Sequence, residues 1–474
     1  MPAGNNSINP HLFRGYSIRG IAAQDLTDDV VVAIGQAIGT FFARRGAETL
    51  VVGRDVRTSS PRISRSLNHG ISTTSISVID VGVVPTPVHN FATDMYAADG
   101  GVMVTASHNP AEYNGLKIRS DRTLGDEDLR EIYEIAVQCP AAEMPATLAE
   151  ETEVGVRQAD PLPSYLERVT AHADMSSRLR VVVDGGNGAA GPIVSRLLRD
   201  LGVQVVEIHC QPDGRFPDRD PDPTAPGATD ALAAAVRDET ADCGLAFDGD
   251  GDRLLLVDEQ GNLVLGDQVL MLLARDVLSA GPARIVHEVL CTQALADDVI
   301  AHGGQPIMTP TGYAFVHQAM LDTGAALGGE LSGHLFLNQP GFRFDDAILG
   351  TVIILSIMSR NSHPLSGLVA ELPAYHSSPP VRLACPDEIK GHVVERVREH
   401  FENAWRVDDL DGARIDFGDG WALVRASNTQ PALSLRFEAS SEQRLSQLTD
   451  QVMQQVEHWM NKLSKANAQK PSKI

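Results

Sequence analysis

The sequence predicts an α/β protein with three related α/β domains in tandem and a fourth, C-terminal α+β domain. Helical and strand-like apolar patterns alternate in three rounds along residues 29–334, and each round ends in a loop of glycines and polar side chains. After about residue 372 this alternation stops, and closely spaced strands lie between two amphipathic helices. A length of 474 residues also exceeds what one hydrophobic core supports, which favours several domains.

The first round is read from apolar residues at helical spacing and from short buried runs. We expect helices over residues 29–45 and 61–71, a further helix after residue 87, and strands over 49–53, 75–81 and 101–104. The last strand leads into Thr-Ala-Ser-His-Asn-Pro at 105–110. Because ligand loops of α/β units gather at the carboxyl ends of strands, this loop is a candidate site.

The second and third rounds have the same form. The second is predicted to contain strands 179–183, 203–208 and 243–247 and helices 191–201 and 228–239, and it ends in the acidic loop 248–253. The third is predicted to contain helices 266–279 and 292–302 and strands 284–289 and 305–308, and it ends in Gly-Gly-Glu-Leu-Ser-Gly-His at 328–334. The longest apolar run, 347–358, predicts a buried helix and is too short to span a bilayer.

The C-terminal part departs from this alternation. We expect strands over 381–384, 413–417, 421–425 and 432–438 and helices over 386–403 and 441–463. Residues 464–474 are polar and rich in lysine, which predicts a disordered tail.

Charge and cysteine content exclude several functions. The formal net charge of −23 disfavours nucleic acid or a membrane as a partner, because both require a basic surface. Five cysteines without a CxxC spacing argue against a disulfide framework or a zinc site. The amino terminus lacks a basic segment followed by an apolar one, so no secretory signal is predicted. We therefore expect a cytoplasmic protein that holds anionic substrates with local arginines.

The stretch 248–253, Asp-Gly-Asp-Gly-Asp-Arg between two apolar runs, predicts a metal site. Asp248, Asp250 and Asp252 repel one another, and their oxygens suit hard cations such as Mg²⁺, Mn²⁺ or Ca²⁺. An EF-hand is one alternative, but Arg253 stands where that loop requires glycine. A solvated acidic turn is another, although such turns are seldom wedged between apolar strands.

Ser107 and His108 follow a predicted strand and precede a proline that stops regular structure. A serine acts as a nucleophile when a base or an already polarised phosphoryl group activates it. A phosphorylated Ser107 would offer an oxygen to the cation held by the three aspartates. Taken alone, such a pair more often belongs to an ordinary turn.

Three further loops carry groups that bind phosphate or sugar, although each alone is more often structural. One loop combines a guanidinium, hydroxyls and an amide, which donate to phosphate oxygens: Arg425, Ser427, Asn428 and Thr429. In a second, Glu330 and Ser332 are flanked by glycines and suit sugar hydroxyls. The third, Phe-Arg-Gly-Tyr-Ser-Ile-Arg-Gly at 13–20, adds two cations, Arg14 and Arg19, that suit phosphate.

Taken together, these motifs resemble those of the α-D-phosphohexomutase family, in particular its phosphomannomutase/phosphoglucomutase branch. The resemblance covers nearly the whole chain in the family's order. Residues 105–110 are similar to its phosphoserine loop, 248–253 to its magnesium loop, 329–334 to its sugar loop and 425–431 to its phosphate-binding loop. Supporting stretches are 53–57 with 59–61, 82–87, 114–117 and 344–346.

The resemblance implies a heart-shaped molecule in which one loop from each domain faces a central cleft. The implied domains are 1–160 with the phosphoserine loop, 161–261 with the metal loop, 262–372 with the sugar loop and 373–463 with the phosphate loop. The implied reaction interconverts the 1-phosphate and 6-phosphate of mannose or glucose through phosphoserine and a hexose 1,6-bisphosphate. One Mg²⁺ per chain is the implied cofactor, the bisphosphate is the activator, and the protein is a monomer or homodimer.

The resemblance also implies residue roles. Ser107 carries the phosphoryl group and completes the metal site of Asp248, Asp250 and Asp252. His108 or Lys117 is the candidate general base, and Arg253 would steady developing charge. The implied substrate contacts are Arg14, Tyr16, Arg19, Glu330, Ser332, His334, Arg425, Ser427, Asn428 and Thr429.

Three positions depart from the family pattern. Ser17 stands where aspartate is usual, Leu290 where lysine is common and Tyr313 where histidine is common. The last two put the preferred substrate or the catalytic efficiency in doubt, and His287 and His317 are the nearby candidates to compensate.

Other functions stay open beside this one. A phosphoglucosamine mutase usually carries an Arg-Pro-Ser-Gly-Thr type of loop, so the Arg-Ala-Ser-Asn-Thr sequence at 425–429 favours mannose and glucose phosphates. A phosphotransferase that mainly makes a sugar bisphosphate is a second enzyme alternative. A sugar-phosphate sensor that kept the fold without catalysis is the alternative from another class.

Overall fold

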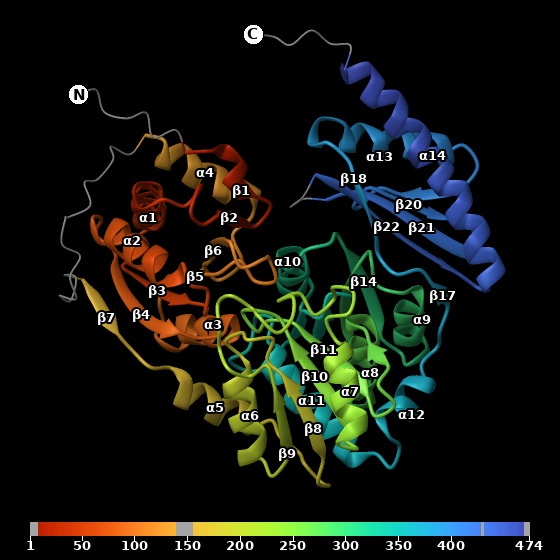
Figure 1. Cartoon of the computed structure of the whole chain (residues 1–474), viewed down its shortest axis with the longest axis horizontal. Helices are drawn as coiled ribbons and strands as arrows, with labels where there is room; N and C mark the ends of the chain where they lie inside the picture. The colour runs from red at the N-terminus through yellow and green to blue at the C-terminus, as the bar shows by residue number, and fades with distance from the viewer. Residues whose placement is uncertain (1–7, 139–154, 428–430, 469–474) are drawn as a thin grey trace.

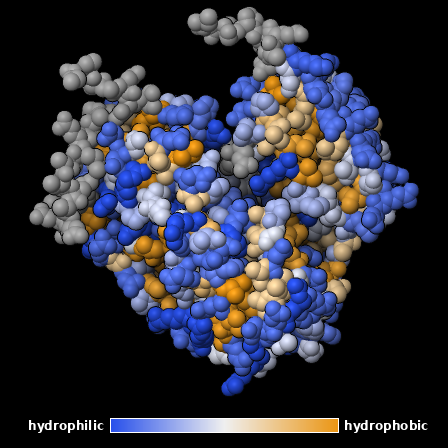
Figure 2. Space-filling model, in the orientation of Figure 1, coloured by the Kyte–Doolittle hydropathy of each residue, from blue (hydrophilic) through white to orange (hydrophobic). Residues whose placement is uncertain are grey.

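The structure is a computed structural model that describes residues 8–138, 155–427 and 431–468. Four β-sheets, each accompanied by helices, give the molecule a heart-like outline (Figure 1). The N-terminal and C-terminal domains form its two upper lobes, and the space-filling view is hollowed between them (Figure 2). The predicted fold class is confirmed. Among the described residues, no helix is long and apolar enough to cross a membrane.

The first sheet has seven strands in the order β1-β2-β6-β5-β3-β4-β7. Its strands are β1 (Phe13–Arg14), β2 (Ser17–Ile21), β3 (Thr49–Arg54), β4 (Ser77–Val83), β5 (Gly100–Val104), β6 (Tyr113–Arg119) and β7 (Val156–Gln158). Its helices are the 3₁₀ turn η1 (Pro10–Leu12), α1 (Asp28–Ala43), α2 (Ser60–Ser72), α3 (Thr86–Met95) and α4 (Asp126–Ala136).

The second sheet has five strands in the order β12-β11-β10-β8-β9. Its strands are β8 (Arg180–Asp184), β9 (Gln204–Ile208), β10 (Cys243–Phe247), β11 (Leu254–Asp258) and β12 (Leu263–Val264), with helices α5 (Leu162–Thr170), α6 (Gly191–Asp200) and α7 (Asp230–Asp238). β12 lies beyond the border predicted at residue 261. The Asp258 carboxylate accepts hydrogen bonds from the backbone N–H groups of Gln260 and Asn262, and this turn folds β12 back onto β11.

The third sheet has four strands in the order β14-β13-β15-β16. Its strands are β13 (Arg284–Glu288), β14 (Gln305–Thr309), β15 (Leu327–Gly329) and β16 (Leu335–Leu337). Its helices are α8 (Gly266–Ser279), α9 (Gln293–Ala301), α10 (Tyr313–Thr323), α11 (Ala347–Arg360) and α12 (Leu365–Ala370).

The fourth sheet is antiparallel wherever its strands pair. Its strands are β17 (His376–Ser377), β18 (Val381–Ala384), β19 (Arg406–Asp408), β20 (Ala413–Asp416), β21 (Gly420–Ala426) and β22 (Ala432–Ala439), with helices α13 (Asp387–Phe401) and α14 (Glu442–Ala468). α14 continues past the predicted end at residue 463. Residues 464–468 of the expected disordered tail are therefore helical, and 469–474 lie outside the described residues.

The first three domains repeat one four-strand arrangement. A central strand, β3, β8 or β13, pairs in parallel with the next two strands of the chain. A fourth strand then pairs antiparallel with the third, which makes a hairpin. The hairpin connections are residues 105–112, 248–253 and 330–334. Each motif loop predicted from the sequence therefore occupies the same place in its own domain.

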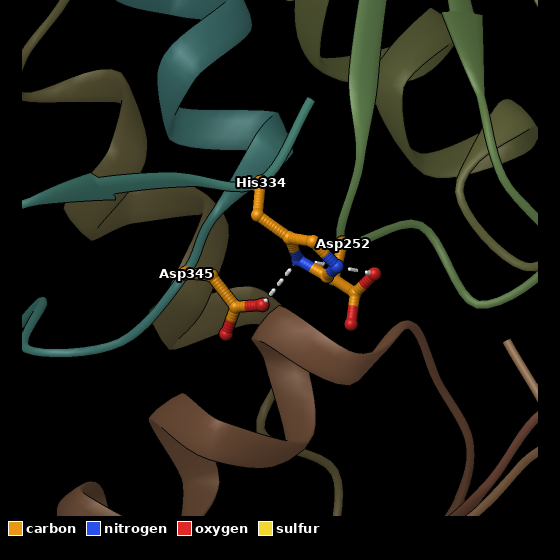
Figure 3. A group of neighbouring side chains, drawn as sticks. All are labelled: Asp252, His334 and Asp345. Atoms are coloured by element: carbon orange, nitrogen blue, oxygen red, sulfur yellow. Dashed lines mark hydrogen bonds and ion pairs between the residues drawn. The ribbon is translucent and has the colours of Figure 1, made fainter. Parts of the chain in front are cut away.

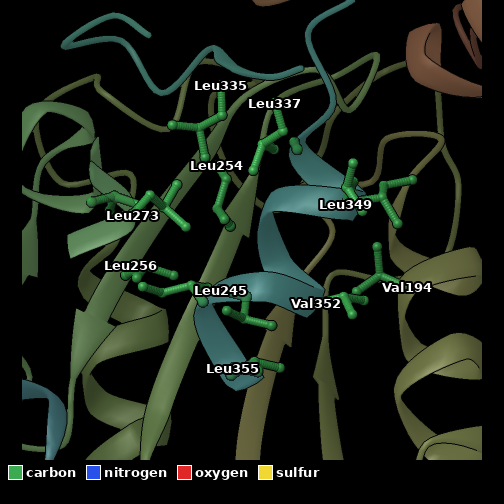
Figure 4. Close-up of a cluster of buried hydrophobic side chains, with 14 of the residues drawn as sticks. Val194, Leu245, Leu254, Leu256, Leu273, Leu335, Leu337, Leu349, Val352 and Leu355 are labelled. Carbon is green, nitrogen blue, oxygen red and sulfur yellow. The ribbon is translucent and has the colours of Figure 1, made fainter. Parts of the chain in front are cut away.

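One continuous apolar core joins these three domains. It includes Val51 on β3. It also includes Leu245 on β10 and Leu355 on α11, which Figure 4 shows. α11, the helix predicted from the longest apolar run, is buried along nearly its whole length. Because close-packed interiors resist deformation, this shared core holds the three hairpin connections in a fixed relation.

The fourth domain has a core of its own, which includes Val393, Phe437 and Leu448. A smaller apolar cluster joins it to the third domain, where Leu290 and Leu331 pack with Trp421 and other residues. The exact domain borders near residues 160, 261 and 372 stay predictions.

Asp346 connects α11 to α5. Its carboxylate caps α11 by accepting from the N–H groups of Ile348 and Leu349, at 3.0 and 2.9 Å. It also accepts a hydrogen bond from the hydroxyl of Tyr165 on α5, at 2.9 Å. Burial outweighs these hydrogen bonds and raises the pKa of Asp346 to about 7.

This raised pKa predicts a pH-dependent contribution to stability. A carboxyl with a higher pKa in the folded state stabilises the fold fully below its unfolded pKa of about 3.9, and this stabilisation is lost as pH rises towards 7. Asp346→Asn keeps a capping acceptor but does not titrate. We expect the stability of the natural protein relative to Asp346→Asn to fall by about 2 kcal/mol between pH 5 and 7, measured by thermal unfolding. Parallel pH curves for the two proteins would contradict this.

Candidate active site

Ser107 lies in the hairpin connection between β5 and β6 and is 1% exposed. Its backbone adopts the left-handed region, with φ at 52°. Its Oγ donates a hydrogen bond to Oδ2 of Asp248 at 2.8 Å, across the boundary between the first two domains. The phosphoserine loop and the metal loop predicted from the sequence therefore meet at their key side chains.

Arg57 holds the Ser107 loop in shape. Its guanidinium is fully buried and pairs with Asp55 at 3.1 Å. It donates to three backbone carbonyls of the loop, including that of Ser107 at 2.8 Å, and to the carbonyl of Tyr113 at the start of β6. The sequence marked the stretch 53–57 only as supporting. The sign of this role in the sequence is that Asp55 and Arg57, two residues apart, directly follow a buried strand.

Asp248, Asp250 and Asp252 come together as predicted. All three are fully buried, and a ligand oxygen from each lies within 4.8 Å of the others. Among the described residues, Oδ1 of Asp250 and Oδ1 of Asp252 have no hydrogen-bond partner. Buried carboxylate oxygens without a donor suit a hard divalent cation, so the residues present fit such a metal.

The first domain supplies two groups to these aspartates. Lys117 on β6 donates to Oδ2 of Asp250 at 2.7 Å and also to Oδ2 of Asp252. Thr86, at the start of α3, donates its hydroxyl to the same Asp250 oxygen at 2.7 Å. The sequence marked the stretch around Thr86 as supporting but gave no sign of this contact.

The charges in this cluster shift the pKa values in different directions. Burial, and then repulsion by neighbouring aspartates, raises the pKa of Asp248 and of Asp252. For Asp250, burial acts in the same direction but is outweighed by Lys117, and the pKa falls below its ordinary value. For Lys117, the penalty of burial is outweighed by Asp250 and Asp252, so its pKa rises. Lys117 is therefore a charged ammonium in this arrangement.

His108 lies beside Ser107, with Nδ1 3.2 Å from Oγ. Burial, followed by the charges of Arg253 and Arg19, lowers the pKa of His108 well below its ordinary value. The imidazole is therefore neutral near pH 7 and keeps a nitrogen able to accept a proton. Of the two predicted base candidates, His108 is the one in a state to act as a base.

The metal loop and the sugar loop pair with each other. Arg253 forms an isolated antiparallel bridge with His334, and the backbone of Leu254 donates to the carbonyl of Gly333 at 3.0 Å. The Nε of Arg253 also donates to Nε2 of His334 at 3.0 Å. Three of the predicted loops are thus joined in one continuous arrangement.

A second group of possible ligands consists of Asp252, His334 and Asp345 (Figure 3). Nδ1 of His334 lies 2.8 Å from Oδ2 of Asp345 and 3.7 Å from Oδ1 of Asp252. Asp345 had been marked only within a supporting stretch, because nothing local in the sequence shows that it meets His334.

Glu330 and Ser332 lie beside each other in the sugar loop. Oε1 of Glu330 accepts from the backbone N–H of Gly312 at 2.7 Å, and Oε2 accepts from the hydroxyl of Ser332 at 2.9 Å. Gly312 has φ at 135°, and a Cβ there would lie 2.5 Å from the ring of Tyr16. Tyr16 is thereby placed next to the sugar loop.

The other two N-terminal candidates differ from each other. Arg19 donates to Ser17 Oγ at 3.1 Å and to Asn109 Oδ1 at 3.0 Å, which places it against the Ser107 loop. Ser17 therefore supports this arginine. Arg14 instead donates to the carbonyl of His11 and lies 3.9 Å from Asp387 of α13, at the edge of the fourth domain.

The phosphate loop begins at the end of β21. Nε of Arg425 donates to Asp411 at 2.8 Å, and the same Asp411 oxygen accepts from the N–H of Thr311 in the third domain at 2.9 Å. The backbone of Ser427 continues the pairing with β22. Asn428 and Thr429 lie outside the described residues. Asp411 was not predicted as a site residue, because an Asp-Gly turn in a sequence does not show which distant residues the aspartate contacts.

The two unusual third-domain residues occupy apolar and aromatic surroundings. Leu290 belongs to the cluster that joins the third and fourth domains. The Tyr313 ring stacks on His334 at 5.5 Å and meets Tyr16 edge-on at 4.7 Å. His317 lines a small cavity of about 20 Å³ with Tyr313 and other residues. Burial lowers the pKa of His317 and of His287 to about 4, so both are neutral near pH 7.

Comparison with known proteins gives one consistent result. Four family profiles match in succession: phosphoglucomutase/phosphomannomutase alpha/beta/alpha domains I, II and III at residues 10–140, 163–261 and 265–375, and the C-terminal domain at 381–455. A phosphomannomutase/phosphoglucomutase of Pseudomonas aeruginosa is 38% identical over 92% of this chain and 93% of its own. A phosphoglucomutase of Neisseria gonorrhoeae is 37% identical over 95% and 98%. The crystal structure of a phosphoglucomutase/phosphomannomutase family protein from Burkholderia thailandensis superposes with a TM-score of 0.85 at 35% identity, covering 95% and 98% of the two chains.

Gly333 allows the metal loop and the sugar loop to approach each other closely. Its φ is 97°, and a Cβ there would lie 2.5 Å from the carbonyl oxygen of Leu254. We expect Gly333→Ala to separate the loops and to lower turnover about 10²-fold, because a misplacement of about 1 Å costs that much. The matched control is Gly391→Ala on α13, where a Cβ has open space and a helix gains up to about 1 kcal/mol. Equal activity of the two variants would contradict this expectation.

Proposed function

The chain belongs to the phosphoglucomutase/phosphomannomutase family, and we propose on this premise that it interconverts hexose 1-phosphate and hexose 6-phosphate. Mannose and glucose phosphates are the proposed substrates, and a hexose 1,6-bisphosphate is both intermediate and activator. The observation that carries the proposal is the 2.8 Å hydrogen bond from Ser107 Oγ to Asp248, within a group of three buried carboxylates. A serine in such surroundings suits transfer of a phosphoryl group.

The proposed reaction has two transfers at one serine. In the first, the bond between Ser107 Oγ and phosphorus breaks while a sugar hydroxyl oxygen bonds to phosphorus, and the hydroxyl proton passes to a base. The bisphosphate then turns round, and Ser107 takes the other phosphoryl group as the steps reverse. His108 is the proposed base, since its Nδ1 lies 3.2 Å from Ser107 Oγ and its imidazole is neutral.

Asp248, Asp250 and Asp252 are the residues proposed to hold one Mg²⁺, with an oxygen of phosphorylated Ser107 as a further ligand. A bound Mg²⁺ would neutralise charge on the phosphoryl oxygens. Lys117 and Thr86 hold Asp250 in place from the first domain, and Arg253 provides a fixed positive charge beside Asp248, at 3.9 Å. Positioning and charge stabilisation are what a phosphoryl transfer chiefly requires from a protein.

The distal phosphate of the substrate is proposed to lie at the fourth domain. Asp411 engages the Nε edge of Arg425, which leaves the terminal guanidinium nitrogens for a phosphate. Ser427, Asn428 and Thr429 are the further proposed donors of this loop. Glu330 and Ser332 are proposed to bond sugar hydroxyls once a substrate replaces their present internal hydrogen bonds.

Several coarser properties complete the proposal. A formal net charge of −23 disfavours nucleic acid or an anionic membrane as a partner. The proposed partner is a hexose phosphate, whose negative charge is met by local arginines. We propose that it works in the cytoplasm as a monomer or homodimer. Arg14, which lies near α13, is proposed to act at the edge between the first and fourth domains and not at the reacting phosphate.

Ser107→Ala tests the phosphoserine. We expect the natural protein to carry about one phosphate at Ser107, which hexose 6-phosphate removes and a hexose bisphosphate restores. The variant should carry none there and should lose turnover by about 10⁴-fold or more, as expected when a covalent nucleophile is removed. Intact-mass spectrometry and a coupled mutase assay measure the two effects. A natural protein that cannot be phosphorylated, together with an unchanged variant, would favour the sugar-phosphate sensor.

Substrate choice is tested with mannose 1-phosphate, glucose 1-phosphate and glucosamine 1-phosphate, each with a trace of its bisphosphate. We expect kcat/KM to be higher for the first two, because the 425–429 sequence differs from the phosphoglucosamine type. Accumulation of bisphosphate without 6-phosphate would instead favour the phosphotransferase. Equal failure on all three substrates would contradict the assignment.

A further inference from the structure

Three side chains form a hydrogen-bonded chain beside the metal loop, from Asp345 through His334 to Arg253. Nδ1 of His334 lies 2.8 Å from Oδ2 of Asp345 (Figure 3), and Nε of Arg253 lies 3.0 Å from Nε2 of His334. Asp345 and His334 are buried, and the side chain of Arg253 is 12% exposed. Little solvent is therefore available to replace these hydrogen bonds.

The order of donors in this chain is fixed by chemistry. Nε of an arginine always carries a hydrogen and only donates. Nε2 of His334 must therefore accept, which requires a neutral imidazole with its proton on Nδ1. Burial lowers the pKa of His334, but the carboxylates of Asp252 and Asp345 outweigh it and raise this pKa. The hydrogen bond from Arg253 acts in the opposite direction, because a doubly protonated ring has no nitrogen left to accept it. The Nδ1 proton points to the carboxylate of Asp345. Asp345 thus selects the one tautomer of His334 that can hold Arg253.

Neighbouring contacts hold the chain in place. The Tyr313 ring stacks on the His334 ring with 26° between their planes. Asp345 bridges to Phe336 on β16, and the next N–H, of Asp346, donates to Leu335 at 2.8 Å. Asp346 turns the other way to cap α11, so two adjacent acids have separate partners.

Arg253 lies where its orientation matters for the reaction. Its Nε is 3.9 Å from Oδ2 of Asp248, the oxygen that accepts the hydrogen bond of Ser107. Its NH1 lies 4.0 Å from Asp222. His334 engages Nε, and among the described residues neither terminal nitrogen of Arg253 donates a hydrogen bond, although NH1 lies near Asp222. This orientation suits a phosphoryl group on Ser107.

We propose that Asp345 is a positioning residue for the phosphoryl transfer and acts through the tautomer of His334 on the orientation of Arg253. This inference rests on the proposed function and adds to it a residue that reaches Arg253 through His334.

The same side chains could instead be considered as a second metal site, because their ligand atoms lie within 4.8 Å. A metal on Nδ1 of His334 would leave the imidazole proton on Nε2, directed at the N–H of Arg253. Two donors would then face each other at 3.0 Å. The hydrogen-bonded chain and the metal site exclude each other, and the geometry favours the chain.

The tautomer is measured directly by ¹⁵N NMR of histidine-labelled protein, with His334→Gln to assign the signal. We expect the Nδ1–H form in the natural protein and in Asp345→Asn, whose amide oxygen still accepts. In Asp345→Ala we expect this single form to be lost. This readout needs no catalytic activity. An Nε2–H form or a doubly protonated ring in the natural protein at pH 7, or an unchanged signal in Asp345→Ala, would overturn the inference. A signal shifted by added Mn²⁺ or Zn²⁺ at Nδ1 would favour the metal site.

A double-mutant cycle tests the effect on catalysis. We expect Asp345→Ala to lower kcat about 10²-fold with little change in KM, and Asp345→Asn to restore most of it. In an Arg253→Lys background, Asp345→Ala should lower kcat by no more than about twofold. Arg253→Lys has by then already removed the guanidinium whose orientation Asp345 maintains.

Asp298→Ala, which breaks a buried ion pair to Arg275 away from the site, is the matched control for stability and should leave kcat unchanged. Independent, additive losses from Asp345 and Arg253 would overturn the inference. Absence of mutase activity in the natural protein would instead contradict the proposed function, while the NMR result would still decide the tautomer.

Discussion

The mutual repulsion of three buried carboxylates is the constraint on which the site depends. Asp248, Asp250 and Asp252 are fully buried, and burying like charges together is costly unless opposite charges and donors surround them. Lys117 comes from the first domain, and the backbone N–H groups of Asp252 and Arg253 come from the loop itself. The hydroxyl of Ser107 completes this set. One of the donors that surround these carboxylates is therefore also the group proposed to carry phosphate.

The repeated four-strand unit explains why these groups meet. Each of the first three domains presents the connection of one hairpin, and the shared apolar core fixes the three connections relative to one another. The fourth domain has its own core and meets the third through a smaller apolar cluster and the Asp411 bridge between Arg425 and Thr311. A reaction whose intermediate must turn round while staying bound requires both retention and room, and one separately packed domain suits that requirement.

Two residues of the third domain depart from the family pattern and change the surroundings of the site. Leu290 joins the apolar cluster with Trp421, and Tyr313 forms an aromatic group with Tyr16 and His334. The arginine and lysine charges near Ser107 come from the first and second domains, and they are Arg19, Arg57, Lys117 and Arg253. Under the proposed function, substrate discrimination at the third domain would depend on these aromatic rings and on Glu330, which is already hydrogen-bonded within the protein.

The sequence by itself determined the alternation of elements, the place of each motif loop after a strand, and the gathering of Asp248, Asp250 and Asp252 as possible metal ligands. These features follow from local patterns, because the spacing of apolar residues and the clustering of carboxylates can be read within a few residues of the sequence. Only the tertiary structure decided that Lys117 is an ammonium paired with Asp250, that Arg14 lies at α13, and that Asp345 and Asp411 have partners in the site. Such pairings join residues distant in the chain or in separate domains, and burial, which sets their charge states, exists only after the domains pack.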